Sequence, residues 1–437
     1  MPSDPRPMTA RRTLLTAVAV VVLLAGALVV WRIAGRGGDT DQAEPKPTVD
    51  STMPDVGTTG TTAPATTTTF MASLPIPEPP PPTVRDPLTW PFAWNSIWNV
   101  PLGSDARRVP AGLSIAEAGV SADEDILILE PTAPLTDILT HDAGWNAQLQ
   151  RCDEATGAPL ITSVPIPDGF VTDPGFLGAT PNHAAAILLP DGDTVVQTQP
   201  LHRCSATGPA VSQYEFARDS LRNGDGIAGA HGGSRMSSIG GTLRLGELVP
   251  GGAIRHALKI NIDCEAFCAY DRAEAEGTPG YRWPALAADF EAPTRYAGPV
   301  PELQMGALLA LPQGFDAESL RTEPARMVAR ALLRYGAYVV DDTRYPVFAI
   351  TTEWSPRGRV IDEFEQAWGF PLHDAAKASC TDDSAACAWV QDMGEIIAAL
   401  EVIDNNGPDA IGGGGAPLAP CAPAYADGTG AAACPTT

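Results

Sequence analysis

The sequence predicts a β-rich domain, mainly antiparallel and built as a sandwich, jelly roll or barrel, with a few packed helices in its C-terminal third. Short aliphatic and β-branched runs bounded by turn residues recur between residues 126 and 353, and helical periodicity appears only after residue 317. An even number of cysteines follows an apolar N-terminal segment, as in exported chains. The net charge of −24 excludes nucleic acid as a partner, because phosphate binding needs a basic face.

The N-terminal segment predicts a membrane anchor. Arg11 and Arg12 precede an apolar run over residues 13–31, which as a helix spans roughly 28 Å, close to the thickness of a bilayer core. We expect a single-pass protein with residues 1–12 in the cytoplasm and the folded domain outside the cell. A cleavable signal peptide is the alternative, with the small residues 25–27 as its cleavage site.

Three further segments are expected beyond the anchor. Residues 35–84 are rich in Thr and Pro and cannot bury enough apolar surface to fold, which predicts a disordered stalk. The β-rich domain is expected over residues 86–411. The tail, residues 412–437, contains successive glycines and is expected to be irregular and tied by a disulfide.

The eight cysteines predict disulfides rather than a metal site, because they lack the paired C-x-x-C spacing of zinc ligands. We expect neither a metal nor a cofactor. Proximity in the sequence suggests four pairs, although eight cysteines allow many others. The suggested pairs are Cys152–Cys204, Cys264–Cys268, Cys380–Cys387 and Cys421–Cys434.

The elements follow from local pattern. A hairpin is expected at "PDGD", residues 190–193, and a helix within residues 317–336 that ends near Gly336. Its apolar face comprises Met327, Val328, Ala331, Leu332 and Tyr335. Residues 362–370 and 389–403 predict two more amphipathic helices. Strands are expected at 126–130, 184–190, 193–200, 241–248, 256–262 and 347–353.

The most unusual segment is "GIAGAHGGSRMSSIGGTLRLGEL", residues 226–248, which contains seven glycines. Glycine at this density predicts unusual backbone geometry or close approach to another group. A serine nucleophile elbow is excluded because Met236 replaces its last glycine. His231 is therefore the candidate for chemistry, as general acid or base, and its alternative is a histidine hydrogen-bonded inside a tight loop.

His256 is the second histidine candidate. On a strand it shares a face with Leu258 and Ile260, which favours a satisfied core histidine over a catalytic one. If both histidines border one cleft, they can act as base and acid. The carboxylate candidates are Asp341, Asp342, Glu247 and Asp225, each with solvated surface charge as its alternative. Adjacent strand residues face opposite sides, so only one of Asp341 and Asp342 can serve a given pocket.

Clustered aromatic residues suggest contacts to sugar rings. Trp90, Trp94 and Trp98 recur at intervals of four, and the alternative for them is a place in the core. The candidate substrate-binding residues are Trp94, Trp98, Tyr281, Trp283 and Arg235.

From about residue 94 to 415 the chain resembles a family of exported proteins of the actinobacterial type. The resemblance rests on "IWNVPLG" (97–103), "GAHGGS" (229–234), "IGGTLRLGEL" (239–248), "IRHALKINI" (254–262), "YRWPA" (281–285), "YGAYVVDD" (335–342) and "DNNGP" (404–408). It implies a shared fold and an extracellular setting, and carries no established activity.

Two functions fit these observations. The first is a membrane-anchored enzyme acting on cell-wall or environmental polysaccharide, as a glycoside hydrolase or lyase. The second is a non-catalytic carbohydrate-binding or cell-surface interaction protein, in which the tryptophans make the contacts and the histidines are structural.

Overall fold

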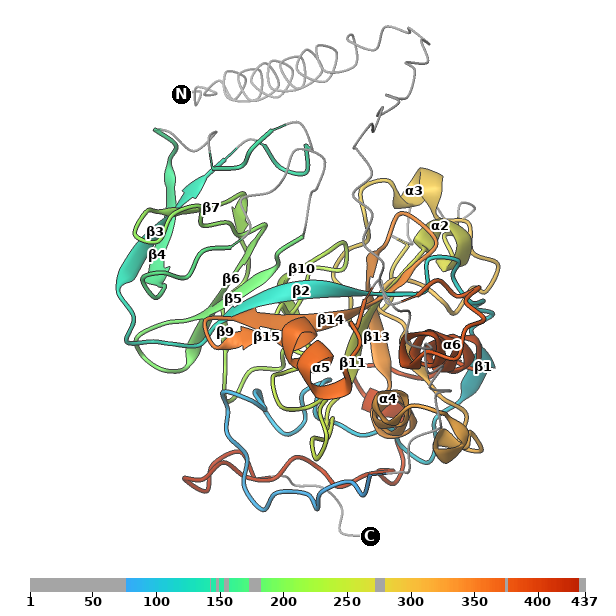
Figure 1. Cartoon of the computed structure of the whole chain (residues 1–437). Helices are drawn as coiled ribbons and strands as arrows, with labels where there is room; N and C mark the ends of the chain where they lie inside the picture. The colour runs from blue at the N-terminus through green and yellow to red at the C-terminus, as the bar shows by residue number, and fades with distance from the viewer. Residues whose placement is uncertain are drawn as a thin grey trace, which may run out of the picture. The chain divides into compact units, whose positions relative to one another are not determined.

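Two β-sheets form the framework of the protein (Figure 1). The computed structural model describes residues 76–431 except 142, 147–148, 153–156, 173–181, 272–279 and 374–375. The large sheet has the strand order β1-β16-β12-β13-β11-β14-β2-β5-β6-β8, with β15 on β14 and β9 on β6. The small sheet has the order β4-β3-β7.

The strands of the large sheet are β1 (Arg108–Pro110), β2 (Val120–Ile128), β5 (Ala185–Leu188), β6 (Thr194–Gln199), β8 (Tyr214–Glu215), β9 (Asp219–Ser220), β11 (Leu258–Ile262), β12 (Leu308–Ala310), β13 (Ala337–Asp342), β14 (Phe348–Ser355), β15 (Gly358–Arg359) and β16 (Glu401–Ile403). Those of the small sheet are β3 (Leu135–Thr140), β4 (Leu160–Pro165) and β7 (Ala210–Ser212). The short strand β10 (Ala228–His231) contacts β5 and β6.

The helices are α2 (Cys264–Phe267), α3 (Ala292–Arg295), α4 (Glu323–Arg334), α5 (Val360–Trp368) and α6 (Ala385–Ala398), with the 3₁₀ turns η2 (Ala317–Ser319) and η3 (Ile411–Gly413). Helix α4 is followed by Gly336 at φ +79°, which confirms the predicted helix end. The β-rich class with a few helices is confirmed, and the helices from α3 onward lie in the C-terminal third, as predicted. The large sheet is mixed, since β2 pairs in parallel with both β5 and β14.

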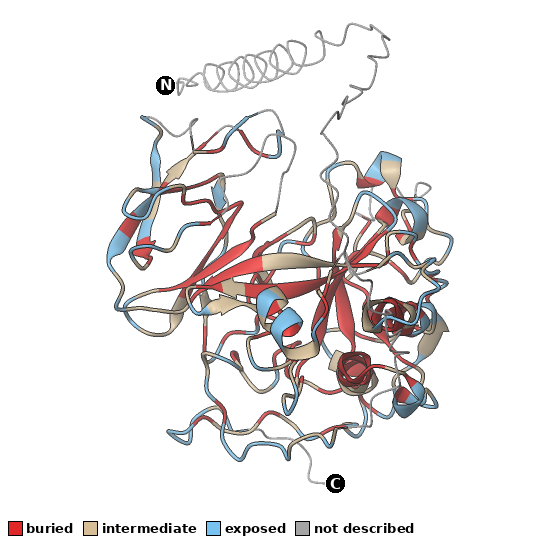
Figure 2. Ribbon diagram, in the orientation of Figure 1, coloured by how far each residue is buried: buried red, intermediate tan, exposed pale blue. Residues whose placement is uncertain are grey.

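The large sheet separates an apolar face from a polar one. On β11, Leu258 and Ile260 line an apolar cavity with residues of α4 and α6, whereas Lys259 and Asn261 point to the opposite face. The glycine-rich segment, residues 226–248, covers that second face, because its main chain accepts from Lys259 and bonds to β14. Figure 2 shows the central strands and α4 buried, with exposed residues mainly at the periphery.

Two local predictions have opposite outcomes. The hairpin at 190–193 is confirmed: β5 and β6 pair antiparallel, and the Asp191 carboxylate accepts the N–H groups of Asp193 and Thr194. The strand expected at 241–248 is wrong, since this segment is a series of turns with a single bridge from Leu243 to Thr352. Leu243 and Leu248 are buried, but only Leu243 exchanges main-chain hydrogen bonds with β14, at Thr351 and Glu353.

Three of the four suggested disulfides are confirmed, namely Cys152–Cys204, Cys264–Cys268 and Cys380–Cys387. Cys434, the suggested partner of Cys421, lies outside the described residues.

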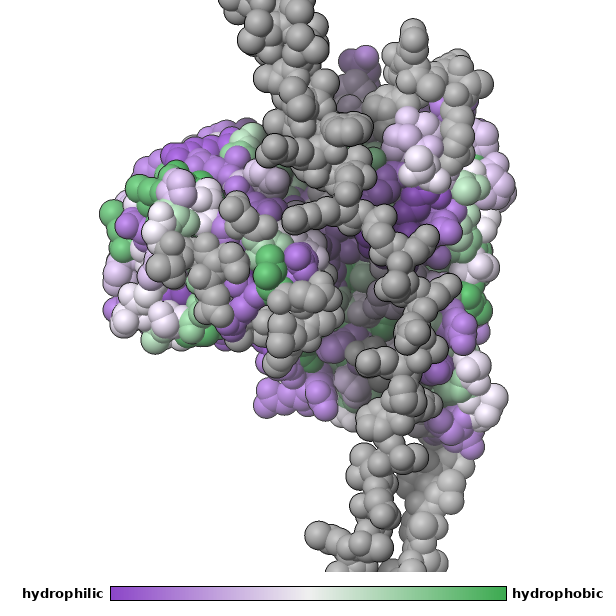
Figure 3. All heavy atoms as spheres, turned by 90° about the horizontal axis from the view of Figure 1, so that it is seen from above, coloured by the Kyte–Doolittle hydropathy of each residue, from purple (hydrophilic) through white to green (hydrophobic). Residues whose placement is uncertain are grey.

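The expected anchor and most of the expected stalk also lie outside the described residues. The last part of the stalk region is in contact with the domain: Glu78 pairs with Arg334, and Arg255 donates to the Pro79 carbonyl. Within the described ranges, no helix combines the length and apolarity needed to cross a bilayer. On the face seen in Figure 3, hydrophobic residues are scattered among hydrophilic ones.

Candidate active site

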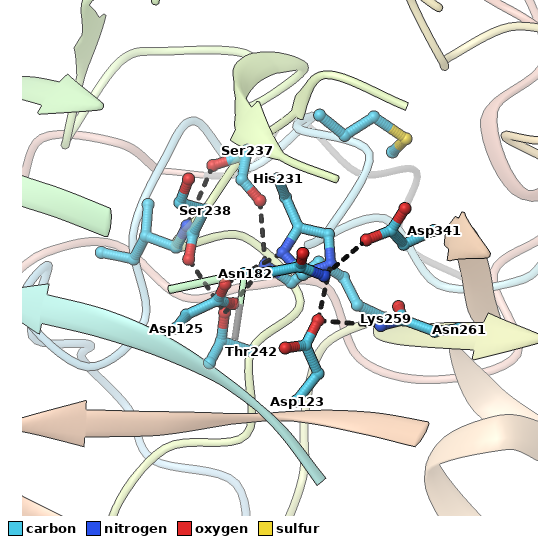
Figure 4. A network of polar contacts seen from close by, with 12 residues as sticks. Asp123, Asp125, Asn182, His231, Ser237, Ser238, Thr242, Lys259, Asn261 and Asp341 are labelled. Atoms are coloured by element: carbon cyan, nitrogen blue, oxygen red, sulfur yellow. Dashed lines mark hydrogen bonds and ion pairs between the residues drawn. The ribbon is translucent and has the colours of Figure 1, made fainter. Parts of the chain in front are cut away.

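A histidine and two carboxylates meet on the polar face of the large sheet (Figure 4). Asp123 and Asp125 occupy alternate positions of β2, so both side chains point to this face. His231 ends β10 above them and is fully buried. Its Nδ1 lies 2.9 Å from Asp125 Oδ1, and its Nε2 lies 3.7 Å from Asp123 Oδ2. The imidazole therefore stands between the two carboxylates of one strand.

Asp125 is held as a buried anion. Its Oδ2 accepts from Lys259 Nζ and from Thr242 Oγ1, both at 2.6 Å. Burial alone would raise the pKa of Asp125, but the charges of Lys259 and His231 and their hydrogen bonds outweigh it and lower the pKa. With Nδ1 of His231 directed at Asp125, the other ring nitrogen, Nε2, faces Asp123.

The Nε2 atom of His231 has no hydrogen-bond partner among the described residues, although it is fully buried. Buried polar atoms are nearly always paired, so an unpaired one is a reason to look for a ligand. The atoms that it faces belong to Asp123 and Asp341, which together with Nε2 lie within 4.8 Å of one another.

A β-bulge places Asp341 in this group. In the parallel pairing of β11 with β13, Ile260 lies opposite Val339 but Asn261 lies opposite Asp341, so that Val340 is an extra residue. Without the bulge, strand alternation would direct Asp341 to the apolar face. The bulge instead places it on the same face as Asn261, whose Nδ2 donates to Asp123.

Asp341 is buried and surrounded by hydrogen-bond donors. Its Oδ1 accepts from the main-chain N–H groups of Gly233 and Asp342, and its Oδ2 accepts from Asn182 Nδ2. Burial raises its pKa well above the usual value, and the nearby carboxylates of Asp289 and Asp123 raise it further. The donors around Asp341 are neutral, so they do not remove this repulsion between carboxylates.

The glycines beside His231 explain how the loop reaches these carboxylates. Gly232 has φ +48°, and a Cβ built on it would lie 2.2 Å from Asp341 Cγ. A Cβ on Gly233 would lie 2.5 Å from Asp289 Oδ2. Any side chain at these positions would push the carboxylates away. The expectation that the glycines permit close approach is therefore confirmed, and the approaching groups are aspartates.

An exposed tryptophan is linked to the site by one side chain. Trp145 is 42% exposed, and its Nε1 donates to Asn182 Oδ1 over 3.1 Å. Asn182 in turn donates to Asp341 over 2.8 Å. A flat apolar surface is thus held beside the buried carboxylates.

The structure brings together two of the predicted catalytic residues, His231 and Asp341. Asp342 points elsewhere, to Arg295 and to the start of α2.

His256 and Glu247 form a separate pair, with His256 Nε2 at 3.1 Å from Glu247 Oε2. His256 precedes β11 instead of lying on it, so the strand placement predicted for it is wrong. Asp225 accepts from the main chain of Ile227 in a turn.

The predicted aromatic residues do not gather at this site. Trp98 is buried, donates to the Gly226 carbonyl and packs against Tyr338. Tyr281 and Trp283 pack partly buried against the core. Trp94 is half-buried, and Arg235 is exposed. Substrate contacts by these residues remain predictions.

Sequence reasoning missed Asp123, Asp125, Lys259 and Asn261. A signal was present: polar residues at alternate positions in "SADEDILI" and "LKINI" interrupt otherwise apolar strands. Trp145 and Asn182 carried no comparable signal. Comparisons of the chain with models of known protein families, with curated proteins and with solved structures find no match.

Proposed function

We propose that this chain is a membrane-anchored enzyme that cleaves a polysaccharide outside the cell, with Asp123, His231 and Asp341 as its reaction centre. The apolar segment 13–31 and the Thr/Pro-rich sequence after it support the exported setting. Three disulfides support an oxidising compartment. The chain and the centre are acidic and repel polyanions, which argues against nucleic acid as the substrate.

One observation carries the proposal: the chain of contacts from Trp145 through Asn182 to Asp341. An exposed indole offers a flat face on which a sugar ring can stack, and amide groups such as Asn182 hydrogen-bond hydroxyls. The adjacent carboxylates and imidazole are the groups that move protons in glycoside cleavage. We propose that a ring stacked on Trp145 presents its neighbouring linkage to the centre.

Two reactions fit such a centre. In hydrolysis, water adds across the glycosidic bond: the anomeric carbon gains a hydroxyl and the departing oxygen gains a proton. In elimination, a base removes a proton from a sugar carbon, the glycosidic oxygen leaves the adjacent carbon with a proton, and a double bond forms. Only elimination produces an unsaturated sugar that absorbs in the ultraviolet.

The test is to incubate the full chain, purified in detergent, with a panel of wall and environmental polysaccharides. New reducing ends without absorbance indicate hydrolysis, and both signals together indicate elimination. Asp123→Asn removes one charge without changing shape and is expected to lower turnover at least a hundredfold. Asp137→Asn makes the same change on an exposed residue of β3 and is the matched control, expected to retain full turnover.

If the folded chain turns over no polysaccharide of the panel, the proposal that it is an enzyme is refuted. Polysaccharide binding that depends on Trp145 without turnover would instead favour the carbohydrate-binding protein, for which the exposed indole is equally suited.

A further inference from the structure

We infer that Asp123, His231 and Asp341 form a binding site for a single divalent cation of the Zn²⁺ and Mn²⁺ class. The inference deepens the proposed function, on which its catalytic consequence rests, whereas binding itself can be measured without any substrate. Four features of the structure support it.

The first is the histidine. Nε2 of His231 is buried, has no hydrogen-bond partner among the described residues and lies 3.7 Å from Asp123 Oδ2. Asp125 fixes Nδ1, and a carboxylate on the far nitrogen is the usual support of a metal-ligating imidazole, since it sets the tautomer and raises the basicity of the free nitrogen.

The second is distance. Two atoms that bind one ion at about 2.1 Å each lie up to about 4.2 Å apart. The separation of 3.7 Å between His231 Nε2 and Asp123 Oδ2 already falls within this range. All three ligand atoms lie within 4.8 Å of one another, so small side-chain movements bring Asp341 into range as well.

The third is charge. Carboxylate oxygens of Asp123 and Asp341 lie within 4.8 Å of one another, which creates electrostatic repulsion, and the buried cation Lys259 bonds to Asp125 instead of to either of them. A divalent cation between Asp123 and Asp341 would offset this repulsion directly.

The fourth is orientation of the carboxylates. Asn261 donates to Asp123, and Asn182 and Gly233 donate to Asp341. Hydrogen bonds to ligating carboxylates fix their direction and are a regular part of metal centres. In this site they come from neutral groups, which orient the oxygens without neutralising them.

The donor set decides the class of ion. One imidazole nitrogen with two carboxylate oxygens suits Zn²⁺ and Mn²⁺, whereas Ca²⁺ and Mg²⁺ take oxygen ligands. Three protein ligands leave positions for water or substrate, as in catalytic sites. A cation there would lower the pKa of a bound water and polarise a substrate oxygen.

The experiment uses the full chain in detergent, stripped with EDTA and titrated with Mn²⁺ or Zn²⁺ alone in a calorimeter. We expect one ion per chain. Asp123→Asn and His231→Gln are expected to weaken binding at least tenfold, and Asp125→Asn, which acts through His231, 10- to 100-fold. Asp137→Asn is the control and should bind as the unmodified chain does. Pulsed electron paramagnetic resonance of bound Mn²⁺ should show coupling to one nitrogen, lost in His231→Gln.

Three outcomes would overturn the site: no uptake at millimolar cation by a folded chain, binding unaffected by Asp123→Asn, or bound Mn²⁺ without nitrogen coupling. Circular dichroism identifies a variant that has unfolded, and the nitrogen coupling in the unmodified chain does not depend on any variant. Binding without polysaccharide cleavage would refute the proposed function and leave the site in place. Cleavage that persists in EDTA would leave the proposed function in place and refute the catalytic role of the cation, whereas the titration alone decides whether the cation binds.

Discussion

Lys259 and Asp125 form an ion pair across an intervening strand. Lys259 lies on β11 and Asp125 on β2, with β14 between them, yet Nζ and Oδ2 are 2.6 Å apart and both side chains are buried. Neighbouring strands are about 4.8 Å apart, so the lysine stem must extend over a full strand. The pair fixes Asp125, and through it the orientation of His231.

Removal of the lysine charge should be strongly destabilising. Lys259→Met leaves Asp125 buried without its main countercharge, and breaking one side of a buried pair costs about 3–5 kcal/mol. Urea unfolding at neutral pH measures the loss. Lys377→Met is the control at an exposed site and should change stability by less than about 0.5 kcal/mol. A double variant with Asp125→Asn should recover part of the loss, and a loss below about 1 kcal/mol in the single variant would refute the importance of the pair.

Gly232→Ala should reduce cation binding and turnover, an effect that backbone strain at this position does not by itself explain. The new methyl group would lie where the Asp341 carboxyl carbon is, so the carboxylate must move. Gly246→Ala is the matched control: its φ is also positive, at +87°, but nothing lies within 4 Å of the new carbon. Both variants should lose about 1 kcal/mol or more of stability from strain. Only Gly232→Ala should also lose cation binding and turnover, and equal behaviour of the two would contradict the close-approach argument.

Trp145 should set affinity for the polysaccharide more than the rate of its cleavage. Trp145→Ala removes the stacking face, and an aromatic contact worth about 1 kcal/mol corresponds to a roughly fivefold rise in KM. Trp145→Phe keeps an aromatic face but loses the bond to Asn182, so it should restore most of the affinity. Steady-state kinetics of the three chains distinguish these effects. An unchanged KM in Trp145→Ala would exclude the indole as a binding surface.

His256 should stabilise the fold in a pH-dependent way. Burial lowers its pKa, but the charge of Glu247 and the hydrogen bonds to Glu247 and to the Ala257 carbonyl outweigh burial, and the net pKa is raised above 6.5. A raised folded-state pKa means that the stabilisation is fully present below about pH 6.5 and is lost as the pH rises through the folded-state value.

The measurement is the difference in unfolding free energy between the unmodified chain and His256→Gln, in EDTA, at pH 6 and pH 9. The difference should be larger at pH 6. Glu247→Gln removes the partner charge and should abolish the dependence. An equal difference at both pH values would show that the pair is not ionic.

The sequence predicted the elements better than the site. Two of the disulfides, Cys264–Cys268 and Cys380–Cys387, the hairpin at 190–193 and the end of α4 depend on residues close in the chain, so local chemistry specifies them. The segment 241–248 has the alternation of a strand, but Gly240 and Gly241 pack against Trp98, and the segment meets β14 only at the bridge between Leu243 and Thr352. Local pattern specifies which residues are buried there, and tertiary packing decides their conformation.

The site depends on contacts that the sequence does not encode locally. Asp123, His231 and Asp341 come from three strands separated by about a hundred residues each. His231 could be singled out because glycines mark the close approach around it. The polar residues of "SADEDILI" single out Asp123 as unusual, but only the strand order, with β2 two positions from β11, shows which residues it meets. In the sequence, Lys259 is only a polar residue within an apolar strand, and its role follows from its partner, Asp125, which the sequence does not indicate.

The bulge at Val340 also gives Asp341 and Asp342, two adjacent residues of the same type, different surroundings. It turns Asp341 to the reaction centre and leaves Asp342 to bind Arg295 and the main chain of Cys264, which tie β13 to α3 and α2. A regular strand would exchange these positions and direct Asp342 to the centre. The backbone, not the side chain, therefore decides which aspartate lies at the proposed centre and which holds β13 against α2 and α3. If the carboxylate at position 341 is lost, Asp342 cannot replace it, because its side chain is directed to Arg295 and Cys264.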